Sequence, residues 1–473
     1  MKKIMLFVLA LCLCFTVFGG TAFAETAPAE ATTAESSAAE APAAEKPAAE
    51  MTAEELYQAG LDAFQAQDYG KMAEILQIAA DAGYTEAWGA LGDLYVQGTG
   101  VEQDYGKAFE YYLKAADLGD ARALYNLGYL YQNGKGVEQD YGKALEYYQK
   151  AADLGDTWSI NNLGYMYENG FGVEQDYGLA MKYYQQAADL DVPYGYAGLG
   201  DLYRSGKGVE QDLLKAGECY KKVLELDADL ATELQEPLNE LAAALRQAGL
   251  DAFDTEDYGK AMEYFQLAAD LGNAEGLRGI GALYHLGLGV EQDYNKALEY
   301  YQQAADQGDA AAMTNIGYLY DDGLGVEQDN DKAMEYYQLA ADKGDVKAMN
   351  GIGTMYADGD GVEQDYGKAL EYYQKAADLG NVEAIHNLGV MYYFGNGVEQ
   401  DYSKAYDCWL RSAEQGEPAG MFCLGECFYE GHGAEKDLDK AAEWYRKALE
   451  AGYEPDETDQ AHLKAVLGDE YQP

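Results

Sequence analysis

The sequence predicts an all-α fold, an α/α superhelical solenoid built from helix–loop–helix repeats of 36 residues. The first observation behind this prediction is a pentapeptide, Gly-Val-Glu-Gln-Asp, that recurs every 36 residues within each half of the chain. The second is a helical spacing of apolar residues on both sides of the pentapeptide. Periods of roughly 20–50 residues are typical of solenoids, in which each unit buries its apolar face against its neighbours. The pentapeptide begins at Gly100, Gly136, Gly172, Gly208, Gly289, Gly325, Gly361 and Gly397, and a variant begins at Gly433.

The composition of the chain limits the classes of partner. Its 473 residues include 84 acidic and 32 basic side chains, which gives a formal net charge of −52. This charge argues against DNA, RNA and anionic membrane surfaces as partners. Six cysteines and four histidines argue against a disulfide scaffold and a histidine-rich metal protein, and a hydrophobic content of 48% argues against global disorder. We therefore expect no nucleic acid, cofactor or metal.

The first 24 residues have the pattern of a secretory signal peptide. Two lysines precede an apolar run at 4–18, and a small-x-small cleavage site ends at Ala24. We expect cleavage after Ala24 and a periplasmic or secreted mature protein. No later segment approaches the ~20 consecutive apolar residues of a membrane helix, so we expect no membrane insertion.

Residues 25–50 contain almost only Ala, Glu, Thr, Ser and Pro. Without large apolar side chains, this segment cannot bury enough surface to offset the entropy lost on ordering. We predict a disordered linker there.

The unit 120–155 illustrates the first helix of a repeat. Leu124, Leu127 and Leu130 form one apolar stripe along 121–133, which predicts a helix, called helix A. Gly128 lies inside this helix at a cost of about 1 kcal/mol relative to Ala. Because glycine recurs at this position in all nine units, we expect close approach of a neighbouring helix.

A glycine loop and a second helix complete the unit. Gly134 and Gly136 end helix A and permit positive φ in the loop. Asp140 is placed to cap the next helix, called helix B, by accepting hydrogen bonds from its free N–H groups. Tyr147 and Tyr148 lie on helix B, and we expect most of the 44 tyrosines of the chain to pack between helices.

A longer duplication divides the chain into two blocks. A heptapeptide that begins at Gln58 returns at Gln247, an offset of 189 residues. Each block opens with a unit that has a shorter turn, predicted to be a helical hairpin. We expect a short helix at 228–237 and a final capping helix at 456–468. The predicted organisation is a signal peptide at 1–24, a linker at 25–50, a first solenoid block at 51–227, a connecting segment at 228–240, a second block at 241–452 and a C-terminal cap and tail at 453–473.

The repeat resembles the Sel-like repeat family, a relative of the tetratricopeptide repeat. The resemblance is carried by Ala-x-x-x-Leu-Gly-x-x-Tyr, then Gly-x-Gly-Val, then Asp-x-x-Lys-Ala-x-x-Tyr-Tyr-x-x-Ala-Ala-x-x-Gly, as in 123–155. It implies superhelical scaffolds that bind proteins or peptides. The opening units, 52–83 and 241–272, are similar to tetratricopeptide repeats themselves.

One cysteine-rich branch of this family is linked with penicillin binding and β-lactamase-like activity. Members of that branch carry a cysteine pair in each repeat. Here the corresponding positions in the unit 120–155 hold Leu124 and Ala152, and this departure argues against β-lactam activity.

Analogy with the tetratricopeptide relatives places variable helix A residues on a concave groove. Tyr and Asn there would supply stacking area and adaptable hydrogen bonds, although a merely solvated inner surface is an equally good interpretation. The candidate groove residues are Tyr125, Tyr129, Gln132, Asn161, Tyr165, Glu168, Arg204, Arg278, His285, His386 and Tyr393.

Three cysteines near the C-terminus form another candidate feature. Cys423 and Cys427 lie four residues apart on one helix, and Cys408 lies on the preceding helix B. In an oxidising compartment, one disulfide among these three is expected to stabilise the last units.

No catalytic arrangement emerges from the sequence, because the four histidines lie in separate units without nucleophile–base or metal-ligand spacing. We therefore predict a non-enzymatic, extracytoplasmic scaffold, a monomer that binds a protein or peptide with a basic patch. The alternatives are a cell-envelope enzyme of the β-lactamase-like or peptidoglycan-acting type, and a secreted factor that acts on a neighbouring cell.

Overall fold

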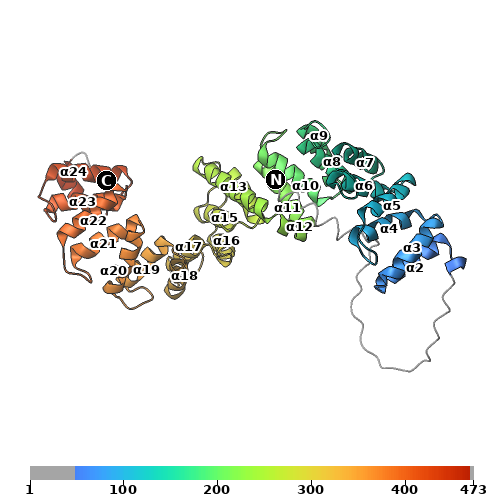
Figure 1. Ribbon diagram of the computed structural model, residues 1–473. Coiled ribbons are helices and arrows are strands. Elements are labelled where there is room, and N and C mark those ends of the chain that lie inside the picture. The colour runs from blue at the N-terminus through green and yellow to red at the C-terminus, as the bar shows by residue number, and fades with distance from the viewer. Residues whose placement is uncertain (1–47, 469–473) are drawn as a thin grey trace, which may run out of the picture. The chain divides into compact units, whose positions relative to one another are not determined.

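A computed structural model describes residues 48–468 of the chain. These residues form 24 α-helices and one short 3₁₀ helix, and the described part of the chain contains no β-strand. The predicted all-α solenoid is confirmed (Figure 1). The predicted signal peptide and most of the predicted linker lie outside the described residues. The last three residues of that linker, Ala48–Glu50, form the 3₁₀ helix η1, so the ordered chain begins slightly earlier than predicted.

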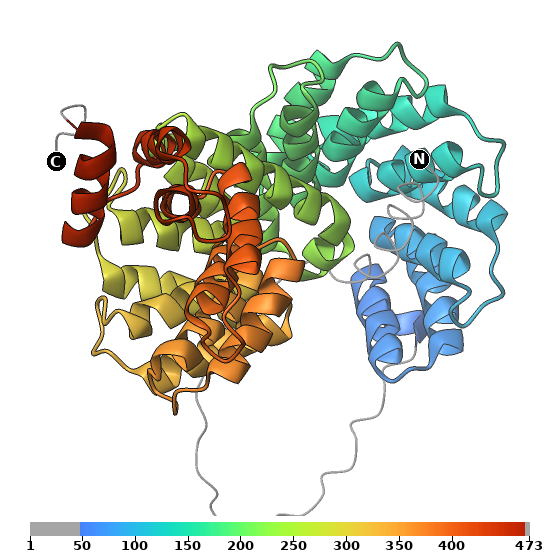
Figure 2. The ribbon, with the colours of Figure 1, turned by 90° about the vertical axis from the view of Figure 1, so that its left-hand side faces the viewer.

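The chain divides into two compact units, Met1–Leu241 and Ala242–Pro473. In unit 1, each helix A packs against its helix B, and successive pairs stack side by side (Figure 2). The helices of unit 1 are α2 Ala53–Gln65, α3 Tyr69–Asp81, α4 Thr85–Gln97, α5 Tyr105–Asp117, α6 Ala121–Asn133, α7 Tyr141–Asp153, α8 Thr157–Asn169, α9 Tyr177–Ala188, α10 Pro193–Ser205, α11 Leu213–Leu226 and α12 Ala228–Glu233.

The same pairing continues in unit 2. Helix α13, Gln235–Asp254, runs across the division between the units. The following helices are α14 Tyr258–Asp270, α15 Ala274–Leu286, α16 Tyr294–Asp306, α17 Ala310–Asp321, α18 Asn330–Asp342, α19 Val346–Asp358, α20 Tyr366–Asp378, α21 Val382–Phe394, α22 Tyr402–Glu414, α23 Pro418–Glu430, α24 Leu438–Glu450 and α25 Glu457–Leu467.

Local sequence signals set the bounds of the helices. Helix A of the unit 120–155 is α6, and it ends at Gly134, whose φ of 64° is readily adopted by glycine. Helix B is α7, and its N-cap Asp140 accepts a hydrogen bond from the backbone N–H of Lys143 at 3.0 Å. The predicted cap and glycine terminus are therefore both confirmed.

The recurrent glycine of helix A allows a ring of helix B to approach closely. A Cβ atom placed on Gly128 would lie 2.7 Å from the ring of Tyr148, which is itself fully buried. The predicted close approach is confirmed in all nine units, because any larger residue would force the two helices apart. The pairs are Gly92 and Tyr112, Gly128 and Tyr148, Gly164 and Tyr184, Gly200 and Tyr220, Gly281 and Tyr301, Gly317 and Tyr337, Gly353 and Tyr373, Gly389 and Trp409, and Gly425 and Tyr445.

The segment between the predicted blocks is helical. The expected short helix is α12, and Leu230 and Ala231 are its buried residues. Helix α13 begins at Gln235, six residues before the predicted opening unit at 241, and this corrects the predicted start of that helix. Pro237 lies in the first turn of α13, where a backbone N–H has no partner within the helix, so proline is tolerated there.

The predicted capping helix is α25, which buries Leu463 and Leu467 at the end of unit 2. His462 of α25 lies 3.0 Å from both carboxylate oxygens of Glu426 on α23. Apolar packing and this polar contact together cover the last repeat.

Candidate protein-interaction site

The predicted groove residues on α6 are more buried than a binding surface requires. Tyr125 is 7% exposed and its ring packs on Tyr148, with the centroids 5.8 Å apart. Tyr129 is 9% exposed, and its hydroxyl accepts a hydrogen bond from Nζ of Lys135 at 3.0 Å. The prediction that both rings line an open surface is therefore corrected, because neighbouring side chains cover them.

Two further predicted residues are engaged by buried tyrosines. The hydroxyl of Tyr148 donates to Gln132 Oε1 at 2.8 Å, and the hydroxyl of Tyr184 donates to Glu168 Oε2 at 2.7 Å. Burial raises the pKa of Glu168 above its ordinary value, with the Tyr184 hydrogen bond acting in the opposite direction. Gln132 and Glu168 on helix A thus accept the hydrogen bonds that the buried tyrosine hydroxyls of helix B donate.

The two predicted residues on α8 differ in their surroundings. Tyr165 is half-buried, and its ring lies 5.7 Å from that of Phe171. Asn161 is partly buried, and its Oδ1 has no hydrogen-bond partner. Because Asn161 Oδ1 is buried, Tyr165 is the better placed of these two to meet a ligand.

The predicted arginines are paired with carboxylates. Arg204 contacts Glu240 at 2.7 Å and Asp201 at 3.2 Å. Arg278 contacts Asp309 at 3.1 Å, and Asp309 lies on the next repeat. Because their positive charge is already compensated, these arginines do not form a site for an acidic ligand.

The remaining predicted residues, in unit 2, belong to aromatic packing. Burial lowers the pKa of His386 to about 4 and also lowers that of His285, so both imidazoles are neutral at pH 7. The Tyr393 hydroxyl lies 3.0 Å from Nδ1 of His432, and its ring lies 5.3 Å from that of Trp409. The ring of His386 also packs on Trp409, with the centroids 6.4 Å apart. The structure thus brings His386 and Tyr393 to the same tryptophan.

A cluster of carboxylates on α17 and α19 is the strongest candidate site in unit 2. Helices α17 and α19 contact each other. Asp321 and Asp358 are their last residues, and Asp322 and Asp360 follow closely. Asp322, Asp358 and Asp360 are all near enough to Asp321 to affect its carboxylate. Asp321 is half-buried, whereas the other three are exposed. Within residues 48–468, none of the four makes an ion pair.

The surroundings of two of these carboxylates, Asp321 and Asp358, disfavour their charged forms. Burial, followed by the neighbouring Asp322, Asp360 and Asp358, raises the pKa of Asp321, although the Tyr337 hydroxyl donates to it at 3.2 Å. Burial and Asp360 also raise the pKa of Asp358. The half-buried ring of Tyr318 lies beside the cluster, and its pKa is raised to about 12, chiefly by burial. Such a surface attracts cationic groups.

These carboxylates are not among the residues predicted from the sequence, although a signal for them exists. Asp321 holds the same place in its repeat as Gln132 and Glu168, which were selected. The same positional rule applied to every unit would have included it. Only the structure shows that Asp321 and its neighbours form a cluster without counter-ions.

The family model of the Sel1 repeat matches most of the chain. The matched segments are residues 90–120, 121–156, 159–192, 193–227, 238–273, 274–309, 310–345, 346–381, 382–417 and 418–453. The chain belongs to the Sel1 repeat family. The second opening unit, which the sequence analysis compared with tetratricopeptide repeats, is among the matched Sel1 repeats. Proteins of this superfamily commonly act as scaffolds for protein–protein interactions and are generally not enzymes.

A solved structure with an SLR fold supports this assignment. The chain is similar to a protective antigen of uropathogenic Escherichia coli with an SLR fold, at 29% identity and a TM-score of 0.51, over 88% of this chain and 90% of the other. A Sel1 repeat protein from Oxalobacter formigenes is 30% identical, with a TM-score of 0.39, and the alignment covers 48% of this chain and 94% of that one. No curated protein matches the chain significantly.

The predicted disulfide is absent from the Sel1 repeats of unit 2. Cys408, Cys423 and Cys427 are free, as is Cys219. Cys408 packs with the apolar cluster of α20 and α21, whereas Cys427 packs with that of α22 to α24, so the two thiols lie in different clusters. Burial raises the pKa of Cys427 to about 12, which keeps the thiol protonated and unreactive.

Two further findings concern ligands and membranes. Within the described residues, no group of three or more His, Cys, Asp or Glu side chains is arranged to hold a metal ion. No helix between residues 48 and 468 has both the length and the apolar content of a membrane span.

The raised pKa of Asp321 predicts a stability effect that depends on pH. The folded protein holds this proton more tightly than the unfolded chain, so the unfavourable contribution of Asp321 grows as pH rises above about 4. Asp321→Asn keeps an acceptor for Tyr337 and removes the charge. We expect it to raise the thermal unfolding midpoint at about pH 7, by a few degrees at most, and to change it little at about pH 4.

Asp329→Asn provides a control of opposite sign. The backbone N–H and side chain of Lys332 lower the pKa of this N-cap carboxylate, so its stabilising contribution is present at neutral pH and is lost on acidification. We expect Asp329→Asn to lower the midpoint at about pH 7. A midpoint lowered by Asp321→Asn at both pH values would contradict the electrostatic account.

Proposed function

We propose that this Sel1 repeat protein is an extracytoplasmic, non-enzymatic scaffold that binds a basic segment of a partner protein. The binding surface is the carboxylate cluster of Asp321, Asp322, Asp358 and Asp360 beside Tyr318. The observation that carries the proposal is the absence of a counter-ion for four clustered carboxylates within the described residues, in a protein where arginines such as Arg278 are already paired. Lysine or arginine side chains of a partner would supply the missing positive charge.

The chemistry of the cluster favours a peptide over a simple ion. Two of the carboxylates, Asp321 and Asp322, lie near the half-buried ring of Tyr318, which offers an apolar and polarisable surface beside the charges. A guanidinium group can stack on such a ring while it pairs with a carboxylate. An arginine-containing segment therefore uses both features.

Location and family provide further support. The N-terminal pattern of charged, apolar and small residues favours export from the cytoplasm. A protein similar in structure is described as a protective antigen, which is consistent with a place outside the cytoplasm. We also propose that the protein acts as a monomer.

The test compares capture by the parent protein and by the variant Asp321→Asn/Asp322→Asn/Asp358→Asn. Both are used as bait in an envelope extract of the source organism, and the affinity of each captured protein is then measured by titration with the purified baits. We expect the variant to bind the partner on the order of tenfold more weakly at low salt, since several charge pairs are lost. We also expect the parent's affinity to fall as salt rises.

A matched variant separates the local cluster from the net charge. Glu102→Gln/Glu138→Gln/Glu174→Gln removes the same number of charges from exposed loop positions of unit 1. It should bind like the parent protein. Equal weakening by both variants would assign binding to the overall charge, and unchanged binding by both would reject the carboxylate cluster as the site.

A further inference from the structure

The helix B side of the repeats carries a ladder of hydrogen bonds. Gln77 donates from Nε2 to Asp81 one turn later at 3.1 Å, and its Oε1 accepts from the hydroxyl of Tyr111 in the next repeat at 2.9 Å. Each such glutamine therefore joins its own helix B to the following one. The same arrangement is formed by Gln149 with Asp153 and Tyr183, by Gln302 with Asp306 and Tyr336, and by Gln338 with Asp342 and Tyr372.

Leu113 interrupts this ladder between the first two of these glutamines. Leucine neither donates nor accepts a hydrogen bond, so the two groups that would meet a glutamine there lose that partner. They are the carboxylate of Asp117 and the hydroxyl of Tyr147. Within residues 48–468, neither group makes a hydrogen bond or an ion pair. The interruption thus leaves two polar groups open beside an apolar side chain.

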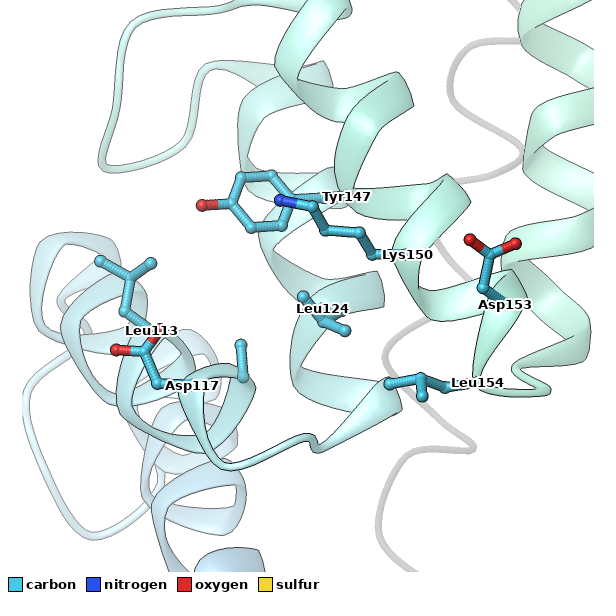
Figure 3. Close-up of a pocket in the computed structure, with 8 residues that line it drawn as sticks. Leu113, Asp117, Leu124, Tyr147, Lys150, Asp153 and Leu154 are labelled. Atoms are coloured by element: carbon cyan, nitrogen blue, oxygen red, sulfur yellow. The ribbon is translucent and has the colours of Figure 1, made fainter.

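A surface hollow of about 400 Å³ lies at the interruption. Figure 3 shows Leu113 and Asp117 on one helix, Leu124 between the helices, and Tyr147 with Lys150 on the next helix B. The complete lining is Leu113, Ala116, Asp117, Leu124, Tyr147, Lys150, Asp153 and Leu154. The hollow therefore has apolar walls and a carboxylate at each end.

A second hollow of about 530 Å³ continues the first. Asp153 lines both hollows, and Asp189 and Leu190 bound the second. Leu154 is 56% exposed and Leu190 is 53% exposed, so both offer apolar surface beside the hollows, as the equivalent Leu118 and Leu379 do in other repeats. The two hollows together form a surface that we call the Leu113 groove.

The charges along this groove favour a cationic occupant. Asp117, Asp153 and Asp189 make no ion pair within the described part of the chain. The ammonium of Lys150 lies over the ring of Tyr147, 5.3 Å from its centroid. Three aspartates and two lysines, Lys150 and Lys182, therefore line the groove, and its net charge is negative.

We propose that the Leu113 groove is a second docking surface, distinct from the carboxylate cluster of unit 2, for a segment of a partner protein with apolar side chains flanked by lysine or arginine. The apolar side chains contact Leu113 and Leu154, and the basic side chains pair with the aspartates, none of which makes an ion pair within the described residues. A second copy of this chain, with its net charge of −52, would bring like charge to the groove. Nucleic acid and anionic lipid are excluded for the same reason.

The test uses a fluorescein-labelled peptide of sequence Lys-Leu-Lys-Lys-Leu-Lys and a matched peptide in which both leucines are serine. Binding to the purified protein is followed by fluorescence anisotropy at low and moderate salt. We expect the leucine peptide to bind about tenfold more tightly than the serine peptide, since burial of apolar side chains adds to the charge attraction. Leu113→Gln should abolish this preference, because it restores both ladder hydrogen bonds and makes the hollow polar.

The contribution of charge is tested separately with Asp153→Asn. We expect this variant to bind the leucine peptide about fivefold more weakly than the parent protein does. The control is Asp306→Asn. Asp306, like Asp153, accepts a hydrogen bond from the glutamine four residues earlier, but the residue after it is Gln307 and not a leucine. The control should bind like the parent protein. Thermal unfolding of Leu113→Gln should occur at or above the parent midpoint, which verifies that the variant is folded.

Two results would overturn the proposal. The first is equal affinity for the leucine and serine peptides in the parent protein, which would indicate general electrostatic attraction. The second is a leucine preference that persists in Leu113→Gln, which would place the peptide elsewhere. Neither result bears on the carboxylate cluster of unit 2, whose variants are different.

Discussion

Tyr337→Ala is expected to lower the free energy of unfolding of unit 2 by about 3–5 kcal/mol, the range typical of a buried aromatic replaced by alanine. The ring of Tyr337 is fully buried between Gly317 on α17 and Gly351 on α19. Glycines have no side chains that could move into the resulting cavity, so the loss should lie towards the upper end of the range. The hydroxyl also donates to Asp321, which would lose its partner.

Urea denaturation followed by circular dichroism measures this loss, and hydrogen exchange locates it. Because repeats contact mainly their neighbours, amide protection should fall most in α17, α18 and α19. Tyr337→Phe keeps the ring and removes one hydrogen bond, so we expect a loss of about 1 kcal/mol. Tyr336→Ala, at the adjacent half-buried position, should cost less than Tyr337→Ala. Similar losses for both alanine variants would contradict the packing role of Tyr337.

Gly136→Ala is expected to lower the free energy of unfolding of unit 1 by about 2–5 kcal/mol, the sum of backbone strain and overpacking. The φ of Gly136 is 70°, which an L-residue adopts at a cost of about 1–2 kcal/mol. A Cβ atom there would also overlap the backbone carbonyl of Tyr105 in the preceding repeat. Backbone cannot change rotamer, so the loop and the neighbouring repeat must separate.

Gly155→Ala distinguishes the two contributions. Gly155 has a φ of 91°, but a Cβ atom there meets no other atom within 4 Å. We expect a loss of only about 1–2 kcal/mol from strain alone. Thermal and urea unfolding of the two variants provide the comparison. Equal losses would show that the loop of one repeat does not rest on the helix of the preceding one.

The groove prediction was wrong for Tyr125 and Tyr129 for a definite reason. Position within helix A was taken to determine exposure, yet Tyr125 is covered by ring packing and Tyr129 is engaged by Lys135, a residue of the following loop. Exposure of a variable position depends on the side chains that the adjoining helices and loops present to it, and repeat position alone does not determine this.

The sequence by itself determined the repeat period, the bounds of α6 and α7, the caps and the close approach of a neighbouring helix at the recurrent glycine. These features depend on local signals, such as the Asp140 cap and the Gly134 terminus. They also depend on repetition, because units with the same sequence pattern adopt the same geometry. Only the tertiary structure decided that Cys408 and Cys427 pack in different clusters, that four aspartates share one surface without a counter-ion, and that Leu113 leaves Asp117 and Tyr147 without partners. The physical reason is that burial and pairing depend on residues about one repeat away, whose side chains meet only when the repeats stack.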